Sequence, residues 1–460
     1  MTPERTLSEF ARACGATLRG ADRPFGEVSI DTRTLKAGDL FVALRGPRFD
    51  GTEFAAAALE RGAAGAVLER AQPLDLAQIV VDDALLALQR AGQVWREACA
   101  IPVVGVAGSN GKTTTKEMTA AILGSAGLCL STRGNLNNHI GVPLTLLRLE
   151  RTHRAAVIEM GANRAGEVAE LVRLARPTVG LITNAGAEHL EGFGSLEGVA
   201  HAEGEMVAGL APAATAVLNA DDPFFALWRG MTAARVVTFG FAATADYRAT
   251  DLDATLSAAG FLTRFTLECP LGRAPIELHV GGRHNVANAL AAAAAAASAG
   301  ASLADIAAGL AAVQPVPGRL QLKQTPGGAW IIDDSYNANP SSVRSGIEVL
   351  ASLAGRHWLV LGDMAELGDY AQSAHQQIGE FARAQGIERL YATGPLAALA
   401  VERFGAGARW FPEGEGLAEA LRAALGEAGT EVSVLVKGSR INRLERVVAA
   451  LSADAPPEAH

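Results

Sequence analysis

Residues 103–115 read VVGVAGSNGKTTT, and this stretch decides how the centre of the chain folds. The small and apolar residues 103–107 predict a buried strand, and a helical pattern follows the threonines. Glycines between them let backbone N–H groups converge on phosphate oxygens at a helix N-terminus. Lys112 can reach terminal phosphates, and the Thr113 hydroxyl can bind Mg²⁺. The predicted nucleotide contacts of this phosphate-binding loop are Ala107, Gly108, Ser109, Asn110, Gly111, Lys112, Thr113 and Thr114.

The loop departs by one residue from the usual G-x-x-x-x-G-K-[ST] pattern, because Gly105 and not Val106 is the upstream glycine. A glycine-rich turn that happens to precede a helix is the alternative interpretation. The order of strand, lysine, three threonines and helix favours nucleotide binding.

Strand-like runs alternate with alanine-rich helical stretches after about residue 101, and such alternation predicts a parallel sheet. The runs span 103–107, 155–158, 179–183 and 216–218. Pro315, Pro317 and Gly318 interrupt the pattern, which then restarts at 330–332, 358–361, 390–392 and 432–436. We therefore expect an α/β protein with domains at 1–98, 99–314 and 315–460, the last a smaller doubly wound domain.

Composition excludes several classes of protein. The chain has 460 residues, 49% hydrophobic, which is enough for several buried cores. Its net charge of −9 includes no block of like charges, so we expect no nucleic-acid partner. Four distant cysteines argue against a disulfide framework and a cysteine zinc site.

Two segments of the sequence bear on the cellular compartment of the protein and on whether it spans a membrane. The N-terminus lacks the apolar segment of a secretory signal. Residues 285–304 carry no charge, but their weakly apolar alanines favour a buried helix over a membrane span. The expectation is a cytoplasmic protein without a membrane span.

Polar residues follow three later strands of the central segment: Glu159, the stretch 184–189 with His189, and Asp221 with Asp222. Carboxyl ends of parallel strands meet at one sheet edge, beside the phosphate-binding loop. Glu159 there suits Mg²⁺, although a lone acid at a strand end is more often a solvated turn. The two aspartates before Pro223 are interpreted as a turn.

Motifs over roughly residues 25–445 resemble those of the Mur ligases. Besides the loop at 105–115 they are SIDTRTLKAGDLFVALRGPRFDG (29–51), GNLNNHIGVPLTLL (134–147), VIEMGANRAGE (157–167), ITNAGAEHLEGFGS (182–195), GRHNVANALAA (282–292), PVPGRLQ (315–321), DDSYNANPSS (333–342), LGDMAELG (361–368) and VKGSR (436–440). The resemblance implies a small N-terminal α/β substrate domain, a central P-loop ATPase and a C-terminal Rossmann-like domain. It also implies an ATP-dependent ligase of peptidoglycan precursor synthesis. The most similar branch couples D-alanyl-D-alanine to UDP-N-acetylmuramoyl-tripeptide through an acyl phosphate.

The resemblance also assigns residue roles. Lys112, Glu159, His189 and Arg319 would be catalytic; Thr113 and Glu159 would hold one Mg²⁺, and His189 a second. Asn285 would contact adenine, Arg319 the γ-phosphate and Asp334 the ribose of ATP. The substrate-binding residues would be Asp31, Thr32, Arg33, Gly46, Asp50, Asn135, Asn137, Asn138 and His139. From the residues alone, Arg319 is equally well a surface charge and Asp334 a turn former.

One departure concerns the second metal. Many family members carry a lysine that becomes carbamylated in the helical stretch after this histidine, but residues 198–205 contain none. Alignment places Glu203 there, and its carboxylate is predicted to be the substitute metal ligand. His201 and Glu205 would then face away from the metal, since on a helix they lie about 200° from Glu203.

Three other functions stay open at this point. The chain could join another amine, as a different ligase of the same family. It could be a nucleotide-dependent switch that hydrolyses ATP without an acceptor, or a structural protein. We expect a monomer with small-molecule substrates.

Overall fold

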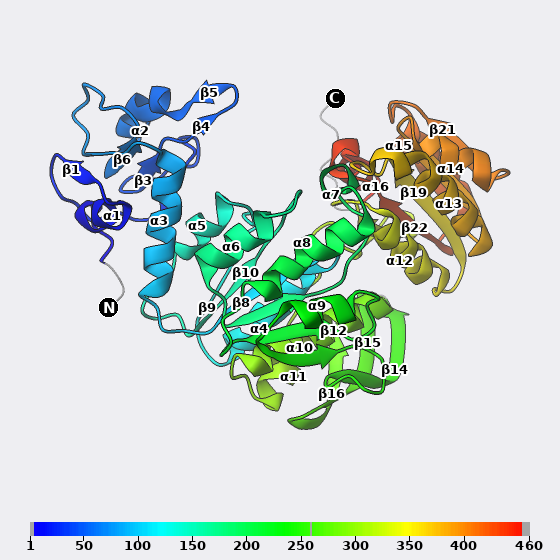
Figure 1. Cartoon of the computed structure of the whole chain (residues 1–460). Coiled ribbons are helices and arrows are strands. Elements are labelled where there is room, and N and C mark those ends of the chain that lie inside the picture. The colour runs from blue at the N-terminus through cyan, green and yellow to red at the C-terminus, as the bar shows by residue number, and fades with distance from the viewer. Residues whose placement is uncertain (1–3, 258–259, 453–460) are drawn as a thin grey trace.

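The computed structural model describes residues 4–257 and 260–452. They form three α/β parts in chain order. Figure 1 shows the N-terminal and C-terminal parts on either side of the central one. The three-domain α/β architecture expected from the sequence is confirmed.

The N-terminal part is a five-stranded sheet in the order β1-β7-β6-β3-β2. Only β1 runs antiparallel to its neighbour. Phe10 and Trp95 are fully buried in its core. The elements are α1 Leu7–Cys14, β1 Thr17–Arg19, β2 Val28–Ser29, β3 Leu40–Val42, the hairpin β4 Arg45–Gly46 and β5 Phe49–Asp50, α2 Ala55–Glu60, β6 Gly65–Leu68, β7 Gln78–Val80 and α3 Ala84–Glu97.

Helix α3 joins the N-terminal part to the central one. It begins at the cap Asp83, whose carboxylate accepts the N–H of Leu86. Its buried Arg96 donates to the carbonyls of Ala175 at 2.8 Å and Arg176 at 3.0 Å, at the end of α6 (Glu167–Ala175). Because helix C-terminal carbonyls lack partners within the helix, this guanidinium ties the two parts together.

The central sheet is parallel throughout, in the order β13-β12-β11-β8-β10-β9. Strand β8, the predicted 103–107 run, lies between β10 and β11, so the carboxyl ends of these three strands are adjacent. Helices cover both faces and bury one hydrophobic cluster on each. The elements are β8 Val103–Ala107, α4 Lys112–Ser125, β9 Cys129–Ser131, α5 Gly141–Leu146, β10 Ala155–Glu159, β11 Val179–Ile182, α7 Leu190–Phe193, α8 Leu196–Ala208, β12 Thr215–Asn219, α9 Phe225–Met231 and β13 Arg235–Phe239.

The alanine-rich stretch forms a buried helix, as expected, but a shorter one than 285–304. Helix α10 spans Arg283–Ser298, and Ser302 caps a second helix, α11, at Leu303–Ala311. Gly300, with φ of 104°, makes the turn between them. Among the helices of the described ranges, none combines the length and the apolarity needed to cross a membrane.

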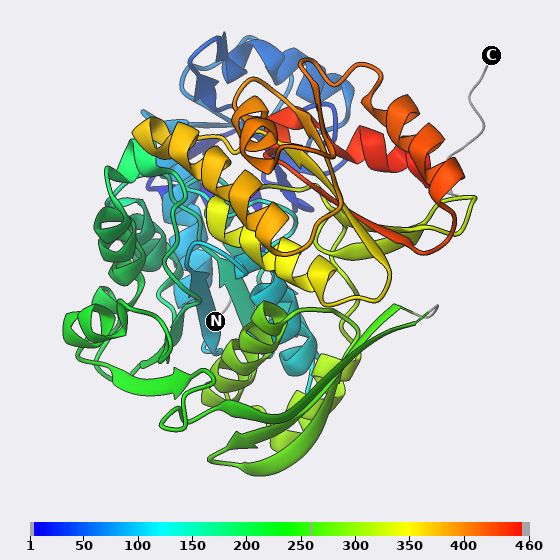
Figure 2. The ribbon, with the colours of Figure 1, turned by 90° about the vertical axis from the view of Figure 1, so that its right-hand side faces the viewer.

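The sequence patterns did not predict a three-stranded antiparallel sheet, β14 Arg248–Ser257, β15 Gly260–Cys269 and β16 Gly272–Leu278. Its signal was present: Phe261, Thr263, Phe265 and Leu267 alternate with more exposed residues along β15. Figure 2 shows the β14–β15 hairpin extending beyond the central sheet toward the C-terminal part. There Phe261 joins the hydrophobic cluster that contains Val349.

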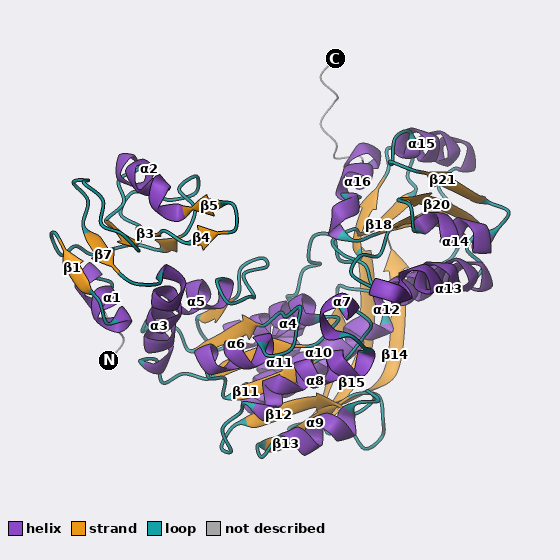
Figure 3. Ribbon diagram, turned by 45° about the horizontal axis from the view of Figure 1, so that its top comes forward, coloured by secondary structure: helices purple, strands orange, loops and turns teal. Residues whose placement is uncertain are grey.

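The C-terminal part is a doubly wound sheet in the order β17-β18-β22-β19-β20-β21, parallel except for β17 at one edge. Figure 3 shows helices on both of its faces. The elements are β17 Gln321–Gln324, β18 Trp330–Asp334, α12 Pro340–Ala351, β19 Arg356–Gly362, α13 Ala371–Ala384, β20 Arg389–Thr393, α14 Ala397–Phe404, β21 Ala408–Phe411, α15 Leu417–Ala428, β22 Val432–Lys437 and α16 Glu445–Leu451.

The close packing of α11 on α4 generates a stability prediction. A Cβ atom on Gly309 would lie 2.4 Å from the Cα of Ile122, a backbone atom that cannot rotate away. Gly309→Ala is therefore expected to separate the helices and to cost about 1–3 kcal/mol of unfolding free energy. Thermal and urea unfolding of the purified chain measure this loss.

Gly124→Ala, in the same α4, is the matched control. A Cβ atom there would meet nothing within 4 Å, so alanine should stabilise the helix by about 0.5–1 kcal/mol. A Gly309→Ala midpoint at or above that of the unmodified chain would contradict the close approach.

Candidate active site

Two glycines give the loop after β8 its shape. Gly108 and Gly111 have φ of 119° and 81°, which side-chain-bearing residues rarely adopt. A Cβ atom would lie 2.1 Å from Thr183 Oγ1 at Gly108 and 2.3 Å from Asn288 Oδ1 at Gly111. The loop can therefore fold against β11 and α10 only with glycine at both positions.

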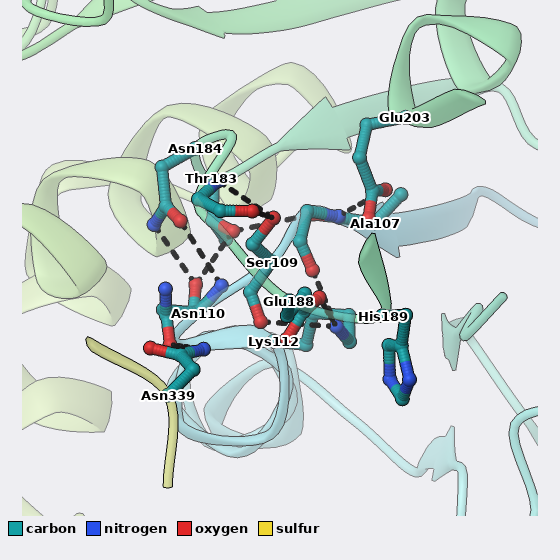
Figure 4. A network of polar contacts seen from close by, with 12 residues as sticks. Ala107, Ser109, Asn110, Lys112, Thr183, Asn184, Glu188, His189, Glu203 and Asn339 are labelled. Atoms are coloured by element: carbon teal, nitrogen blue, oxygen red, sulfur yellow. Dashed lines mark hydrogen bonds and ion pairs between the residues drawn. The ribbon is translucent and has the colours of Figure 1, made fainter. Parts of the chain in front are cut away.

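The loop is held by the segment that follows β11 (Figure 4). The Asn110 carbonyl accepts from Thr183 Oγ1 at 2.7 Å, and the Asn110 N–H donates to Asn184 Oδ1 at 3.0 Å. The hydroxyl of Ser109 accepts the N–H of Gly186 at 2.8 Å. These bonds fix the loop before any ligand arrives.

Lys112 is folded back onto the loop in this structure. Its ammonium donates to the carbonyls of Gly108 at 2.5 Å and Ser109 at 3.2 Å, and it lies 3.3 Å from Glu188 Oε1. Burial by itself lowers the pKa of the Lys112 ammonium, but nearby carboxylates outweigh this effect and raise it above its ordinary value. They belong to Glu188, Glu203 and Glu159.

Glu203 reaches the loop from α8, and in Figure 4 it approaches on the opposite side from Lys112, Glu188 and His189. The Gly108 N–H donates to Glu203 Oε2 at 2.6 Å, and the side chain is buried. Burial raises the pKa of this carboxyl to about 7, with Lys112 partly opposing the shift. Glu205 faces elsewhere, as expected, because its carboxylate accepts N–H groups at the start of α6.

Glu159, at the end of β10, has the features of a cation ligand. Its Oε1 accepts from Asn137 Nδ2 at 2.9 Å and from Thr113 Oγ1 at 3.3 Å. Its Oε2 is buried without a hydrogen-bond partner, which is costly for a carboxylate. A Mg²⁺ ion, which takes few protein ligands and completes its shell with phosphate oxygens and water, fits this oxygen. Within the described ranges, no three His, Cys, Asp or Glu side chains gather into a metal cluster.

One cavity beside the loop, about 350 Å³, has apolar walls that include Phe239, Val280 and Val313. The predicted residues that line it are Asn110, Gly111, Thr114, Asn285, Arg319 and Asp334. We call it the apolar-walled cavity. Asn285 is fixed there because its Nδ2 donates to the Gly281 carbonyl at 2.7 Å.

A second cavity, of about 300 Å³, is lined mainly by polar groups, and we call it the polar cavity. The predicted residues around it are Ser109, Asn110, Gly111, Lys112, Thr113, Asn135, Asn137, Asn138, Glu159, His189, Arg319 and Asp334. Arg319 and Asp334, from the C-terminal part, line both cavities. The Arg319 Nη2 donates to Thr113 Oγ1 at 3.1 Å. The two cavities therefore flank the phosphate-binding loop and share a wall.

Other predicted residues lie elsewhere. Asp31 pairs with Arg33 in the N-terminal part, beside Thr32, and Asp50 lies with Gly46 on the β4–β5 hairpin. None of these five lines either cavity. His139 also lies outside the two linings; its carbonyl accepts from Gln89 Nε2 at 3.3 Å. Ala107 ends β8, fully buried behind the loop.

The aspartate pair after β12 behaves as the predicted turn. Asp221 accepts the N–H groups of Phe241 and Ala242, and Asp222 accepts those of Phe224 and Ala185. Through Ala185, this turn also supports the segment behind the loop.

Sequence reasoning missed several residues of the site. Asn339 Nδ2 donates to Asn110 Oδ1 at 2.8 Å, and Lys437 Nζ donates to Asp334 Oδ2 at 2.5 Å. Glu366 contacts Nδ1 of His189 across the two parts. Glu188 was missed as a partner of Lys112, although it directly precedes His189 at a strand end. Asn339, Glu366 and Lys437 lie in the motifs at 333–342, 361–368 and 436–440, so these motifs could have indicated them as site residues.

Comparisons with known proteins agree over the whole chain. Three family models match in order: "Mur ligase family, catalytic domain" at 24–104, "Mur ligase middle domain" at 106–296 and "Mur ligase, glutamate ligase domain" at 318–440. The UDP-N-acetylmuramoyl-tripeptide–D-alanyl-D-alanine ligase of Escherichia coli is 44% identical over 97% of this chain and 98% of that protein.

Solved structures of similar proteins agree with the sequence comparisons. The MurF crystal structure from Acinetobacter baumannii has a TM-score of 0.89 and 33% identity over 98% of this chain and 99% of its own. MurF from Thermotoga maritima, in complex with ADP, has a TM-score of 0.79 and 27% identity over 92% and 96%. Since the three matched models cover most of the chain and the loop, sheet order and full-length relatives all agree, the chain belongs to the Mur ligase family.

Proposed function

We propose that this chain is the ATP-dependent ligase that joins D-alanyl-D-alanine to UDP-N-acetylmuramoyl-tripeptide, forming ADP and phosphate in peptidoglycan precursor synthesis. The observation that carries the proposal is the phosphate-binding loop flanked by two cavities, in a chain whose full-length relatives bear this activity in their names. It acts as a monomer in the cytoplasm.

Each part has a separate task, with boundaries at 1–98, 99–314 and 315–460. The first binds the UDP end of the substrate, and the residues assigned to it there are Asp31, Thr32, Arg33, Gly46 and Asp50. The polar loop with Asn135, Asn137, Asn138 and His139 guides the peptide toward the phosphate-binding loop. The C-terminal part contributes Arg319 and Asp334 and receives the dipeptide.

The apolar-walled cavity suits the nucleoside of ATP. Its apolar walls match a purine face, and Asn285, whose side-chain amide is held by Gly281 and Asn288, lines the cavity where the ring edge would lie. Lys437 donates to Asp334 Oδ2 and partly neutralises this carboxylate. The other oxygen, Oδ1, accepts the Leu320 N–H at 3.3 Å and has a further lone pair that can accept a ribose hydroxyl. The phosphates then lie along the loop N–H groups at the start of α4.

Phosphoryl transfer depends here on positioning and charge. Lys112 leaves its backbone carbonyls for the β- and γ-phosphates, and Arg319 reaches the γ-phosphate from its place beside Thr113. The tripeptide carboxylate, a poor electrophile, becomes an acyl phosphate, which the dipeptide amine attacks with loss of phosphate. Domain contact around the site excludes water from this reactive acyl group.

Thr113 and the unpartnered Glu159 Oε2 would hold Mg²⁺. When bound, it neutralises the charge that develops on the phosphate oxygens. His189 lines the same polar cavity and is the assigned ligand of a second ion. The sequence predicts Glu203 as a ligand of that second ion, but in this structure the Glu203 Oε2 accepts the Gly108 N–H, and Glu203 does not line the polar cavity.

The direct test is release of ADP from ATP with UDP-N-acetylmuramoyl-tripeptide, with and without D-alanyl-D-alanine. We expect ADP release to need both substrates and to yield the pentapeptide nucleotide by mass spectrometry. Hydrolysis indifferent to the dipeptide would instead support a nucleotide-dependent switch, and a response to another amine would indicate a different ligase of the family.

Lys112→Ala tests the phosphate-binding loop. Removing the ammonium takes away transition-state charge stabilisation, so steady-state turnover should fall by roughly 10²–10³-fold. Lys36→Ala, an exposed lysine of the N-terminal part, is the control and should retain activity. Turnover of Lys112→Ala close to that of the unmodified chain would contradict the assignment of the ATP site.

His284, beside Asn285, makes stability depend on pH. Burial lowers the pKa of this imidazole to about 4, Asp334 partly opposes the shift, and Lys437 reinforces it. The unfolded chain binds its proton near pH 6.5, so folding loses stability as pH falls from about 6.5 toward 4. The unfolding midpoint should therefore drop further between pH 7.5 and 5 in the unmodified chain than in His284→Gln.

The control for this effect is His201→Gln, an exposed histidine on α8. Its midpoint should follow that of the unmodified chain across the same pH range. Parallel curves for His284→Gln and the unmodified chain would contradict the prediction that the half-buried His284 imidazole is neutral in the folded chain.

A further inference from the structure

In the part of the chain that the structure describes, the carboxylate of Glu188 is the one acidic group in contact with the ammonium of Lys112. The two side chains are 11% and 17% exposed, so the pair is largely removed from water. Among the described residues, Lys112 is also the only hydrogen-bond partner of that carboxylate. A charge buried this far is costly to leave unpaired, so Glu188 needs another cation whenever Lys112 departs.

The proposed reaction requires that departure. In this structure Lys112 Nζ is bound by two loop carbonyls and by Glu188, so all three contacts must be exchanged for phosphate oxygens when ATP binds. Phosphates then draw Lys112 away from Glu188 and add negative charge beside the Glu188 carboxylate. A divalent cation between the Glu188 carboxylate and the phosphates would pair with that carboxylate and would also reduce its repulsion by the phosphates.

The geometry separates Glu188 from the other candidate, Glu203. Glu188 and its neighbour His189 line the polar cavity together with Glu159, whereas Glu203 does not. Glu203 Oε2 accepts the Gly108 N–H at 2.6 Å from the α8 side, and this bond supports the loop backbone. The position of Glu203 therefore suits an anchor of the loop, and that of Glu188 suits a cation ligand.

We propose that Glu188 has two partners in turn: Lys112 in the nucleotide-free chain, and, with His189, a second divalent cation once nucleotide is bound. Glu188 thus supplies the carboxylate oxygen that sequence alignment assigned to Glu203. The proposal rests on the proposed function, because the phosphates of ATP exchange the two partners.

Mn²⁺ as the metal probe and a non-hydrolysable ATP analogue test this without turnover. Electron paramagnetic resonance titration of the unmodified full chain with the analogue should show two Mn²⁺ ions per chain. Glu188→Gln, which keeps shape but removes charge, should retain the first ion and bind the second at least about 10-fold more weakly. In EDTA the same variant should bind the analogue more tightly, because Lys112 no longer has to leave a carboxylate.

Two variants serve as comparators. Glu191→Gln, an exposed acid in the same segment, should leave both ions unchanged, and Glu188→Asp should partly restore the second. Glu203→Gln should keep the second ion, since an amide oxygen still accepts the Gly108 N–H. Thermal unfolding of each variant verifies that it is folded.

Several outcomes would overturn the proposal: a second ion bound equally well by Glu188→Gln, loss of that ion in Glu203→Gln alone, or a single Mn²⁺ in the unmodified chain. Failure of the proposed function shows separately, as ADP release that does not respond to the dipeptide. That result would leave the two-ion titration and its dependence on Glu188 to be judged independently.

Discussion

The close approach of backbone at the end of β8 is the constraint on which the site depends. Gly108 lies against Thr183 and Gly111 against Asn288, at distances that leave no room for a Cβ atom. The loop is thereby pressed between β11 and α10, and the N–H groups of Gly108, Ser109 and Asn110 are bonded to Glu203 and Asn184. The N–H groups in the first turn of α4 are the ones that face a ligand. Because β10 and β11 flank β8, Glu159 and the segment with His189 end at the same place.

This arrangement concentrates negative charge around one lysine. Three carboxylates surround Lys112 before any phosphate arrives, and their combined field keeps its pKa high despite burial. Such a site is electrostatically unbalanced for a triphosphate unless divalent cations enter with it. Metal binding and nucleotide binding are thus linked by charge, since cations that enter with the phosphates reduce the repulsion between the phosphates and the carboxylates.

Much of this could be predicted from the sequence because the signals were local. The 103–107 strand, the glycine positions and the lysine lie within 13 residues, and the parallel sheet follows from regular alternation. The antiparallel β14–β16 sheet was missed because its alternation is diluted by alanine, threonine and charged residues. Side-chain partners such as Glu188 with Lys112 are separated by 76 residues, and no local pattern encodes their contact.

The C-terminal part closes the site through contacts that no single motif describes. Asn339 bonds the side chain of Asn110, Arg319 bonds Thr113, and Glu366 touches His189. Each of these partners on the central part belongs to the loop or to the polar cavity. The first two contacts are hydrogen bonds, and the Glu366–His189 contact is partly exposed, where an ion pair contributes little to stability. The importance of the three contacts is therefore geometric. They place both domains against the same few atoms, and any ligand that rearranges the loop must also alter how the C-terminal part is held.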